Sequence, residues 1–134
     1  MDENIVIVLD IDGTITPHKK TSREIIEKVK DMGVPVVFNT SRLKIWKQMG
    51  LRTFNIPSKD IYHRIHINET KSKIRNLYRI CYDYNVKPMN VYMFDNSCKR
   101  LKKMRRLGFN VVCVDSKTGV NPDDVYDIFT SRRV

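Results

Sequence analysis

Asp10 and Asp12 are two carboxylates that follow directly on the apolar run IVIVL. Carboxylates at the end of a buried strand are unfavourable unless a cation or hydrogen-bond donors neutralise them. A divalent cation together with a phosphate group would do so. Gly13 lets the backbone turn sharply beside a ligand, and Thr14 completes the sequence DIDGT. The simpler interpretation is a strand-to-turn connection in which aspartate serves only the backbone.

Polar residues also follow a second apolar run, VPVVFN. Thr40, Ser41 and Arg42 would lie at a helix start, where exposed amides favour an anion. The alternative is that Thr40 or Ser41 simply caps the helix. Lys71 and Lys73 open the longest helical pattern, where lysine opposes the helix dipole and local stability does not favour it. Their simpler interpretation is tolerated surface charge.

A last carboxylate, Asp95, ends the apolar run VYMF, and Asn96 follows it. The six basic residues between positions 99 and 106 then predict a helix with a strongly positive face. Asp95 is therefore either a functional carboxylate at the end of a strand or a helix N-cap.

Apolar periodicity predicts the elements that would carry these side chains. Strands are expected over residues 4–10, 34–39, 61–67, 91–95 and 111–114, and helices over 21–32, 41–49, 70–84, 97–107 and from 121 to about 129. Alternating strands and helices indicate a parallel sheet covered on both faces. Ligands of such sheets bind at the carboxyl ends of the strands. Asp10, Thr40 and Asp95 are expected to meet there.

Composition limits the class of protein. A length of 134 residues fits one domain over residues 1–134. No run reaches the roughly 18–20 apolar residues of a membrane span. Cys81, Cys98 and Cys113 are irregularly spaced and predict neither a disulfide framework nor a zinc site. We therefore expect an intracellular protein, cytoplasmic or nuclear. The formal net charge of +10 favours polyanionic partners, although a solvated basic surface is the simpler interpretation.

In order and spacing, Asp10-x-Asp12-Gly-Thr, Thr40, a lysine at a helix start and Asp95 resemble the four motifs of haloacid-dehalogenase-like (HAD) phosphatases. Residues 73–115 are most similar to small enzymes of the magnesium-dependent phosphatase-1 type. The resemblance implies a Rossmann-like, three-layer α/β domain with a five-stranded parallel sheet in the order 3-2-1-4-5. The segments between Asp12 and Thr40 and between Thr40 and residue 73 leave no room for a cap domain.

The same resemblance implies Mg²⁺-dependent hydrolysis of a phosphomonoester through an aspartyl-phosphate. Asp10 would be the nucleophile and Asp12 the general acid and base. Thr40 would donate a hydrogen bond to a phosphoryl oxygen. Lys73, with Lys71 as the second choice, would stabilise the transferring group.

The remaining site residues follow from the same motifs. The residues expected to bind the substrate are Gly13, Thr14, Ser41, Arg42 and Lys71, and those expected to hold Mg²⁺ are Asp10, Asp12, Asp95 and Asn96. Asn96 is a departure from the family, which usually has a second acidic residue in its last motif. Without that charge, Mg²⁺ is expected to bind more weakly.

An open, cap-less site favours a macromolecular substrate, either a nucleic-acid end or a phosphoprotein; the alternative is closure by a neighbouring subunit. The basic helix over residues 97–107 suits a nucleic acid, although the sequence shows little aromatic interleaving for base stacking. A second hypothesis is a catalytically weakened binding protein that uses its basic face to bind nucleic acid or an acidic partner. A receiver-type phosphoacceptor fits less well, because its acceptor aspartate lies on the third strand.

Overall fold

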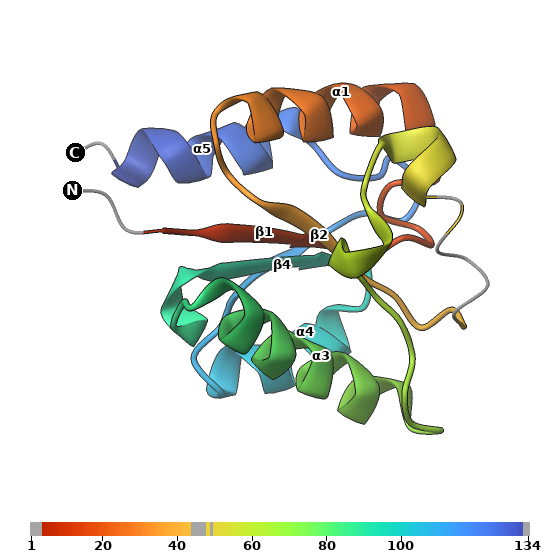
Figure 1. The fold of residues 1–134 in the computed structure, drawn as a ribbon, viewed down its shortest axis with the longest axis vertical. Coiled ribbons are helices and arrows are strands. Elements are labelled where there is room, and N and C mark those ends of the chain that lie inside the picture. The colour runs from red at the N-terminus through yellow and green to blue at the C-terminus, as the bar shows by residue number, and fades with distance from the viewer. Residues whose placement is uncertain (1–3, 44–47, 49, 133–134) are drawn as a thin grey trace.

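The structure, a computed structural model, describes residues 4–43, 48 and 50–132. Its five strands are parallel and lie in the order β3-β2-β1-β4-β5 (Figure 1). The strands are β1 (Val6–Leu9), β2 (Val36–Asn39), β3 (Ile61–Tyr62), β4 (Val91–Asp95) and β5 (Asn110–Cys113). The α-helices are α1 (Lys19–Asp31), α3 (Glu69–Tyr84), α4 (Cys98–Arg106) and α5 (Pro122–Arg132). This confirms the predicted fold class and strand order.

Helices cover both faces of the sheet. In Figure 1, α1 and α5 lie on one side of β1, and α3 and α4 lie on the other. Ile26 and Val125 belong to the core of the first face, and Leu77 and Leu101 belong to the core of the second. All four residues of β1 are buried, because both faces of this central strand are covered. That burial explains why its sequence is a continuous apolar run.

The register of the sheet brings the strand ends together. Leu9, the last residue of β1, pairs with Phe38 of β2 and with Phe94 of β4. The next residues along these three strands therefore reach the same edge of the sheet. The peptide nitrogen of Asp10 still bonds the carbonyl of Phe94, at 2.9 Å. No inserted cap domain is present among residues 4–43 or 50–73.

The third predicted strand is wrong beyond its first two residues. β3 ends at Tyr62, and Ile65 and Ile67 are exposed rather than buried. The peptide nitrogen of Ile65 bonds the hydroxyl of Ser72 at 3.0 Å. The chain is thus held by the first turns of α3 instead of pairing with β2. The alternation of apolar and polar residues over 61–67 predicted an edge strand, and it does not distinguish such a strand from a loop bound to the start of a helix.

The short helix expected over residues 41–49 lies mostly outside the described residues. Gly50 was expected to end it, and instead begins the π-helical segment η2 (Gly50–Phe54). Two 3₁₀ segments, η3 (Ser58–Asp60) and η4 (Pro88–Asn90), lead into β3 and β4. No described helix is long and apolar enough to cross a membrane.

The expectation that the cysteines form no disulfide is wrong. Cys98, the first residue of α4, is bonded to Cys113, the last residue of β5, with the Cα atoms 5.3 Å apart. The crossover from β4 through α4 to β5 brings the two together, which a spacing of 15 residues did not indicate. Disulfides persist mainly in oxidising environments. The cysteines therefore no longer support the expected reducing compartment.

Candidate active site

A buried lysine between two buried carboxylates forms the centre of the site. The Lys73 Nζ donates to Asp10 Oδ1 at 2.6 Å and to Asp95 Oδ2 at 2.8 Å. The three residues are 1%, 4% and 0% exposed. Buried charges are stable only when they are paired and hydrogen-bonded, so Lys73 is stabilised by both carboxylates and each carboxylate by Lys73. The β1 and β4 ends supply the carboxylates, and α3 supplies the lysine.

Two asparagines hold the start of α3 against β2. Asn39 Nδ2 donates to the backbone carbonyl of Lys73 at 3.0 Å, and Asn76 Nδ2 donates to Asn39 Oδ1 at 3.0 Å. Asn68 caps the helix by accepting from the Lys71 peptide nitrogen at 2.9 Å. This docking turns Lys73 inward, whereas Lys71 is exposed on the outer side of the helix. Lys73 is therefore the lysine in contact with Asp10.

Arg42 holds Asp12. Its Nε donates to Asp12 Oδ2 at 2.6 Å, and its terminal nitrogen pairs with the other carboxylate oxygen. The hydrogen bond to Asp12 raises the pKa of the Arg42 guanidinium. The Arg42 peptide nitrogen donates to the hydroxyl of Thr40, at 3.0 Å. Thr40 is buried, and Ser41 beside it is half-buried. The segment 40–42 thus lies beside the carboxylate expected to move protons.

Gly13 and Thr14 pack against the same carboxylates. Thr14 Oγ1 donates to Asp10 Oδ2, a long contact at 3.4 Å. Gly13 adopts a φ of +79°, and a Cβ there would lie 2.4 Å from the Asn96 amide. Its backbone conformation therefore favours glycine, and a larger residue would also displace the Asn96 side chain.

Three oxygen atoms converge on the Asn96 side chain. With its amide nitrogen turned toward them, Asn96 donates to Asp95 Oδ1 at 3.1 Å, to Asp10 Oδ2 at 3.2 Å and to the Asp12 carbonyl at 3.3 Å. Mg²⁺ prefers oxygen ligands from carboxylates and carbonyls, so the donor set fits this ion. No group of three or more His, Cys, Asp or Glu side chains among residues 4–43, 48 and 50–132 is placed to hold a metal. Mg²⁺ would therefore depend on the Asp12 carbonyl and on the Asn96 oxygen.

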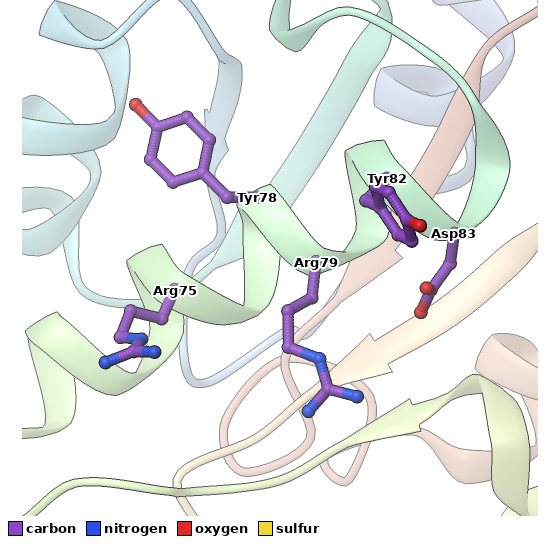
Figure 2. Close-up of a pocket in the computed structure, with 5 residues that line it drawn as sticks. All are labelled: Arg75, Tyr78, Arg79, Tyr82 and Asp83. Carbon is purple, nitrogen blue, oxygen red and sulfur yellow. The ribbon is translucent and has the colours of Figure 1, made fainter.

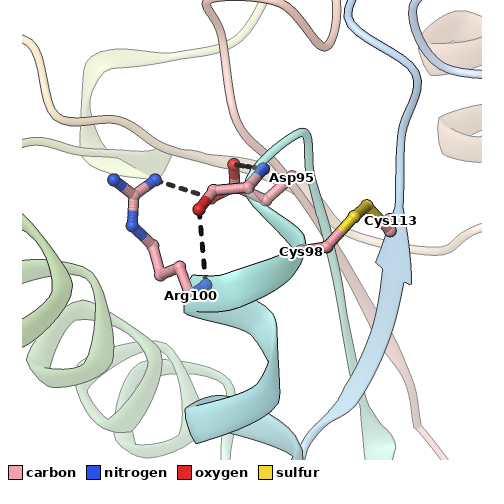
Figure 3. The surroundings of a disulfide bond; sticks show 5 residues. Asp95, Cys98, Arg100 and Cys113 are labelled. Atoms are coloured by element: carbon pink, nitrogen blue, oxygen red, sulfur yellow. Dashed lines mark hydrogen bonds and ion pairs between the residues drawn. A yellow bond between two sulfur atoms is a disulfide. The ribbon is translucent and has the colours of Figure 1, made fainter.

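A network of charges that sequence reasoning missed supports Asp95. Arg100 of α4 donates to Asp95 Oδ2 at 3.2 Å (Figure 3). It also donates to Glu69 at 3.1 Å. Arg64 completes the network with an ion pair to Glu69 at 3.5 Å. The Cys98–Cys113 disulfide lies on the other side of the same helix start (Figure 3). The only signal in the sequence was Arg100 itself, five residues after Asp95 and in the first turn of α4.

Burial controls the ionisation of Asp10. Removal from water raises the pKa of Asp10 from 3.8 to about 6, since the effect outweighs the opposing charge of Lys73, and Asp95 raises it further. Asp10 is therefore half ionised near pH 6, and the anion that a nucleophile requires predominates only as the pH rises above that value.

We expect the Asp10 carboxyl to titrate near pH 6 in the protein without added Mg²⁺. Carboxyl-detected NMR of aspartate-labelled protein measures this midpoint, and Asp10→Asn assigns the resonance. Because the positive charge of Lys73 lowers the pKa, Lys73→Met is expected to move the midpoint upward. A midpoint near 3.8 would show that Asp10 is not desolvated as the structure describes.

Comparison with known proteins gives structural matches alone. No family profile matches the chain, and no curated protein sequence matches it. The structure resembles an uncharacterized protein from Corynebacterium glutamicum with a TM-score of 0.70 and 12% identity, over 98% of this chain and 97% of that one. It also resembles the core domain of a provisional phosphoglycolate phosphatase from Streptococcus pneumoniae, with a TM-score of 0.67 and 15% identity, over 97% and 98% of the two chains.

A further match is a predicted HAD-like family hydrolase from Porphyromonas gingivalis, with a TM-score of 0.54 and 14% identity. The match covers 82% of this chain and 56% of that one. At these identities the likeness concerns the fold. The chain thus shares its fold with a predicted HAD-like hydrolase and with the core domain of a phosphatase, and the full-length match to that core domain agrees with the absence of a cap among the described residues.

Proposed function

We propose that this protein is a Mg²⁺-dependent phosphomonoester hydrolase that acts through an aspartyl-phosphate on Asp10. The contact of Lys73 with both Asp10 and Asp95 carries the proposal. Three ionisable groups withdrawn from water at the carboxyl edge of a parallel sheet are a costly arrangement with no evident structural need. They suit a reaction in which a carboxylate attacks an anionic phosphate.

The chemistry divides between two carboxylates. An Asp10 oxygen forms a bond to phosphorus while the bond to the ester oxygen breaks, and Asp12 gives that leaving oxygen a proton. Water then attacks the aspartyl-phosphate, Asp12 takes its proton, and Asp10 is released. Lys73 holds Asp10 in position and neutralises phosphoryl charge. Arg42 must release Asp12 for this exchange. Its half-buried guanidinium would then pair with the phosphate.

The residues that would hold Mg²⁺ are Asp10, Asp95, the Asp12 carbonyl and, after its amide turns over, Asn96. Bound Mg²⁺ screens the repulsion between carboxylate and phosphate. Without Mg²⁺, the Asn96 NH₂ group donates hydrogen bonds to the oxygens of Asp10, Asp12 and Asp95 that would bind the ion. Arg100 and Lys73 also supply positive charge to Asp95, so we expect the ion to bind weakly.

Asn96→Asp is expected to increase Mg²⁺ affinity by on the order of tenfold, because ligand charge strengthens divalent-cation binding. Without Mg²⁺, the same variant should melt at a lower temperature than wild type, since three favourable hydrogen bonds become contacts between oxygens. Thermal unfolding with increasing Mg²⁺ measures both effects, because a ligand that binds only the folded state raises Tm. An equal Mg²⁺-induced shift in the two proteins would place the ion away from Asn96.

A macromolecular phosphate is the substrate class that the surface favours. The described chain carries no cap over the site, and α4 begins beside Asp95. Its exposed basic residues are Lys99, Lys102, Lys103, Arg105 and Arg106. Such a surface attracts the phosphates of a nucleic acid.

The test is phosphate release from an aryl phosphate, a phosphopeptide, a sugar phosphate and a 3′-phosphorylated oligonucleotide, each with and without Mg²⁺. Metal-dependent release supports the proposal, and the preferred substrate identifies the class.

Two features favour a second candidate, a binding protein with a weakened site. Arg100 pairs with Asp95, and Asn96 lies where the family usually has an acid. No release from any substrate, together with salt-sensitive oligonucleotide binding, would support this candidate.

A further inference from the structure

The exposed side of α3 combines basic and aromatic side chains in a regular order. Lys71, Arg75 and Arg79 recur every four residues, so successive positive groups rise by about 6 Å along the helix. Each arginine is followed three residues later by a tyrosine, Tyr78 or Tyr82, so the two tyrosines are also four residues apart. All five side chains are exposed, and we call them the α3 row. The sequence had suggested little aromatic interleaving; the helix shows that it is present.

The distal part of the α3 row lines an open groove. Its volume is about 510 Å³, and its walls are Arg75, Tyr78, Arg79, Tyr82 and Asp83 (Figure 2). Tyr78 is 45% exposed and Tyr82 is 87% exposed. Large aromatic side chains so open to water on a surface helix indicate a binding surface rather than a core.

Neighbouring residues hold much of this surface in place. Tyr78 packs edge to face against Phe109, with the ring centroids 5.3 Å apart. The Arg79 guanidinium lies 6.0 Å from the centroid of the Tyr62 ring, and Arg75 contacts His66 Nε2 at 3.2 Å. A surface fixed in advance loses less conformational entropy when it binds a ligand.

We propose that the α3 row binds single-stranded nucleic acid and directs its phosphorylated end to Asp10. Guanidinium and ammonium groups would pair with successive phosphates, and the phenol rings would stack on unpaired bases. A duplex hides its base faces, and a single phosphoamino acid has no use for repeated positive and aromatic groups. α4 offers charge without exposed tyrosines, so it lacks the stacking component.

The row also leads toward the proposed reaction centre. α3 begins at the edge of the sheet where Lys73 contacts Asp10. Tyr82 lies nine residues after Lys73, roughly 14 Å along the helix. Lys71 lies in the first turn of α3, so a nucleic-acid strand bound along the α3 row would have its end at the proposed reaction centre. This part of the inference rests on the proposed hydrolase function, whereas binding to the row does not.

Binding is tested with a fluorescent single-stranded oligonucleotide and the Asp10→Asn protein, which separates binding from turnover. Tyr78→Ala/Tyr82→Ala is expected to weaken binding by at least about tenfold, because it removes two stacking contacts. Tyr78→Phe/Tyr82→Phe keeps both rings and should stay within about twofold of the parent. Arg75→Ala/Arg79→Ala should reduce the slope of log Kd against log salt by about 1.4, the value for two lost phosphate contacts.

The matched control is Lys20→Ala/Arg23→Ala, which removes the same charge from exposed positions of α1 on the other face of the sheet. Its salt slope should equal that of the parent. An equal loss in this control would show that binding follows overall charge. Parent-like affinity in the tyrosine-to-alanine variant, or tighter binding of a duplex or a phosphopeptide, would also overturn the inference.

Kinetics separate this inference from the proposed function. In the wild-type background, Arg75→Ala/Arg79→Ala is expected to raise KM for the 3′-phosphorylated oligonucleotide and leave kcat unchanged. Row-dependent binding without any turnover would refute the hydrolase and retain the α3 row as a binding site. Turnover of the oligonucleotide with the same KM in wild type and variant would refute binding by the α3 row and support the proposed hydrolase function.

Discussion

Asp10→Asn is expected to reduce phosphate release by at least about a thousandfold, as the loss of a covalent nucleophile does in other enzymes. The amide carries no negative charge, and its nitrogen cannot form the aspartyl-phosphate. The variant should still fold, because it keeps the size of the side chain and removes one of two carboxylates that share Lys73. Phosphate release from the preferred substrate, at saturating Mg²⁺ and above pH 6, measures the effect.

Asp31→Asn is the matched control, because Asp31 is exposed at the end of α1 and undergoes the same chemical change. It should release phosphate at the wild-type rate. Intact-mass analysis after rapid acid quenching provides an independent readout, since only proteins with Asp10 should carry a transient phosphoryl group. Activity of Asp10→Asn within about tenfold of wild type would exclude Asp10 as the nucleophile.

Lys73→Met is expected to lower the free energy of unfolding by about 3–5 kcal/mol, the usual cost of removing one partner from a buried ion pair. Methionine fills a similar volume, so the loss comes from charge. Asp10 and Asp95 would then face each other with Arg100 as the remaining cation on Asp95. Urea unfolding at pH 7.5, with the disulfide oxidised in both proteins, gives the difference.

The pH dependence of that loss has a definite sign. Because the folded-state pKa of Asp10 is raised above 3.8, the folded protein binds a proton more readily than the unfolded chain does. Stability from this group therefore decreases as pH rises from about 4 to about 6. Lys73→Met should extend this decrease to higher pH, so its deficit should become smaller on acidification through the Asp10 pKa.

Lys71→Met is the control for Lys73→Met, since it removes the same charge two residues away from an exposed position. It should change stability by no more than about 0.5 kcal/mol. Equal stability of Lys73→Met and wild type at pH 7.5 would mean that the charge of Lys73 does not stabilise the buried carboxylates in the native protein.

Local patterns in the sequence predicted the fold class and the strand ends that carry the candidate site. The run IVIVL predicted a central strand because a strand covered on both faces needs apolar residues throughout. The residues Asp10 and Asp95 were placed correctly at strand ends, because polarity changes abruptly there. α3 was predicted to within a residue at its start, since apolar spacing and an N-cap reflect backbone geometry that acts over a few residues.

Tertiary structure alone decided which side chains meet. By sequence Lys73 was preferred and Lys71 was the second choice, and the contacts of Asn39 and Asn76 with α3 turn Lys73 toward Asp10. The pairing of Arg100 with Asp95 and the Cys98–Cys113 bond likewise appear only in the folded chain. Apolar periodicity indicates whether a segment forms a helix or a strand and which of its faces is buried. Contacts between segments depend on helix rotation and packing against the sheet, which no single segment encodes.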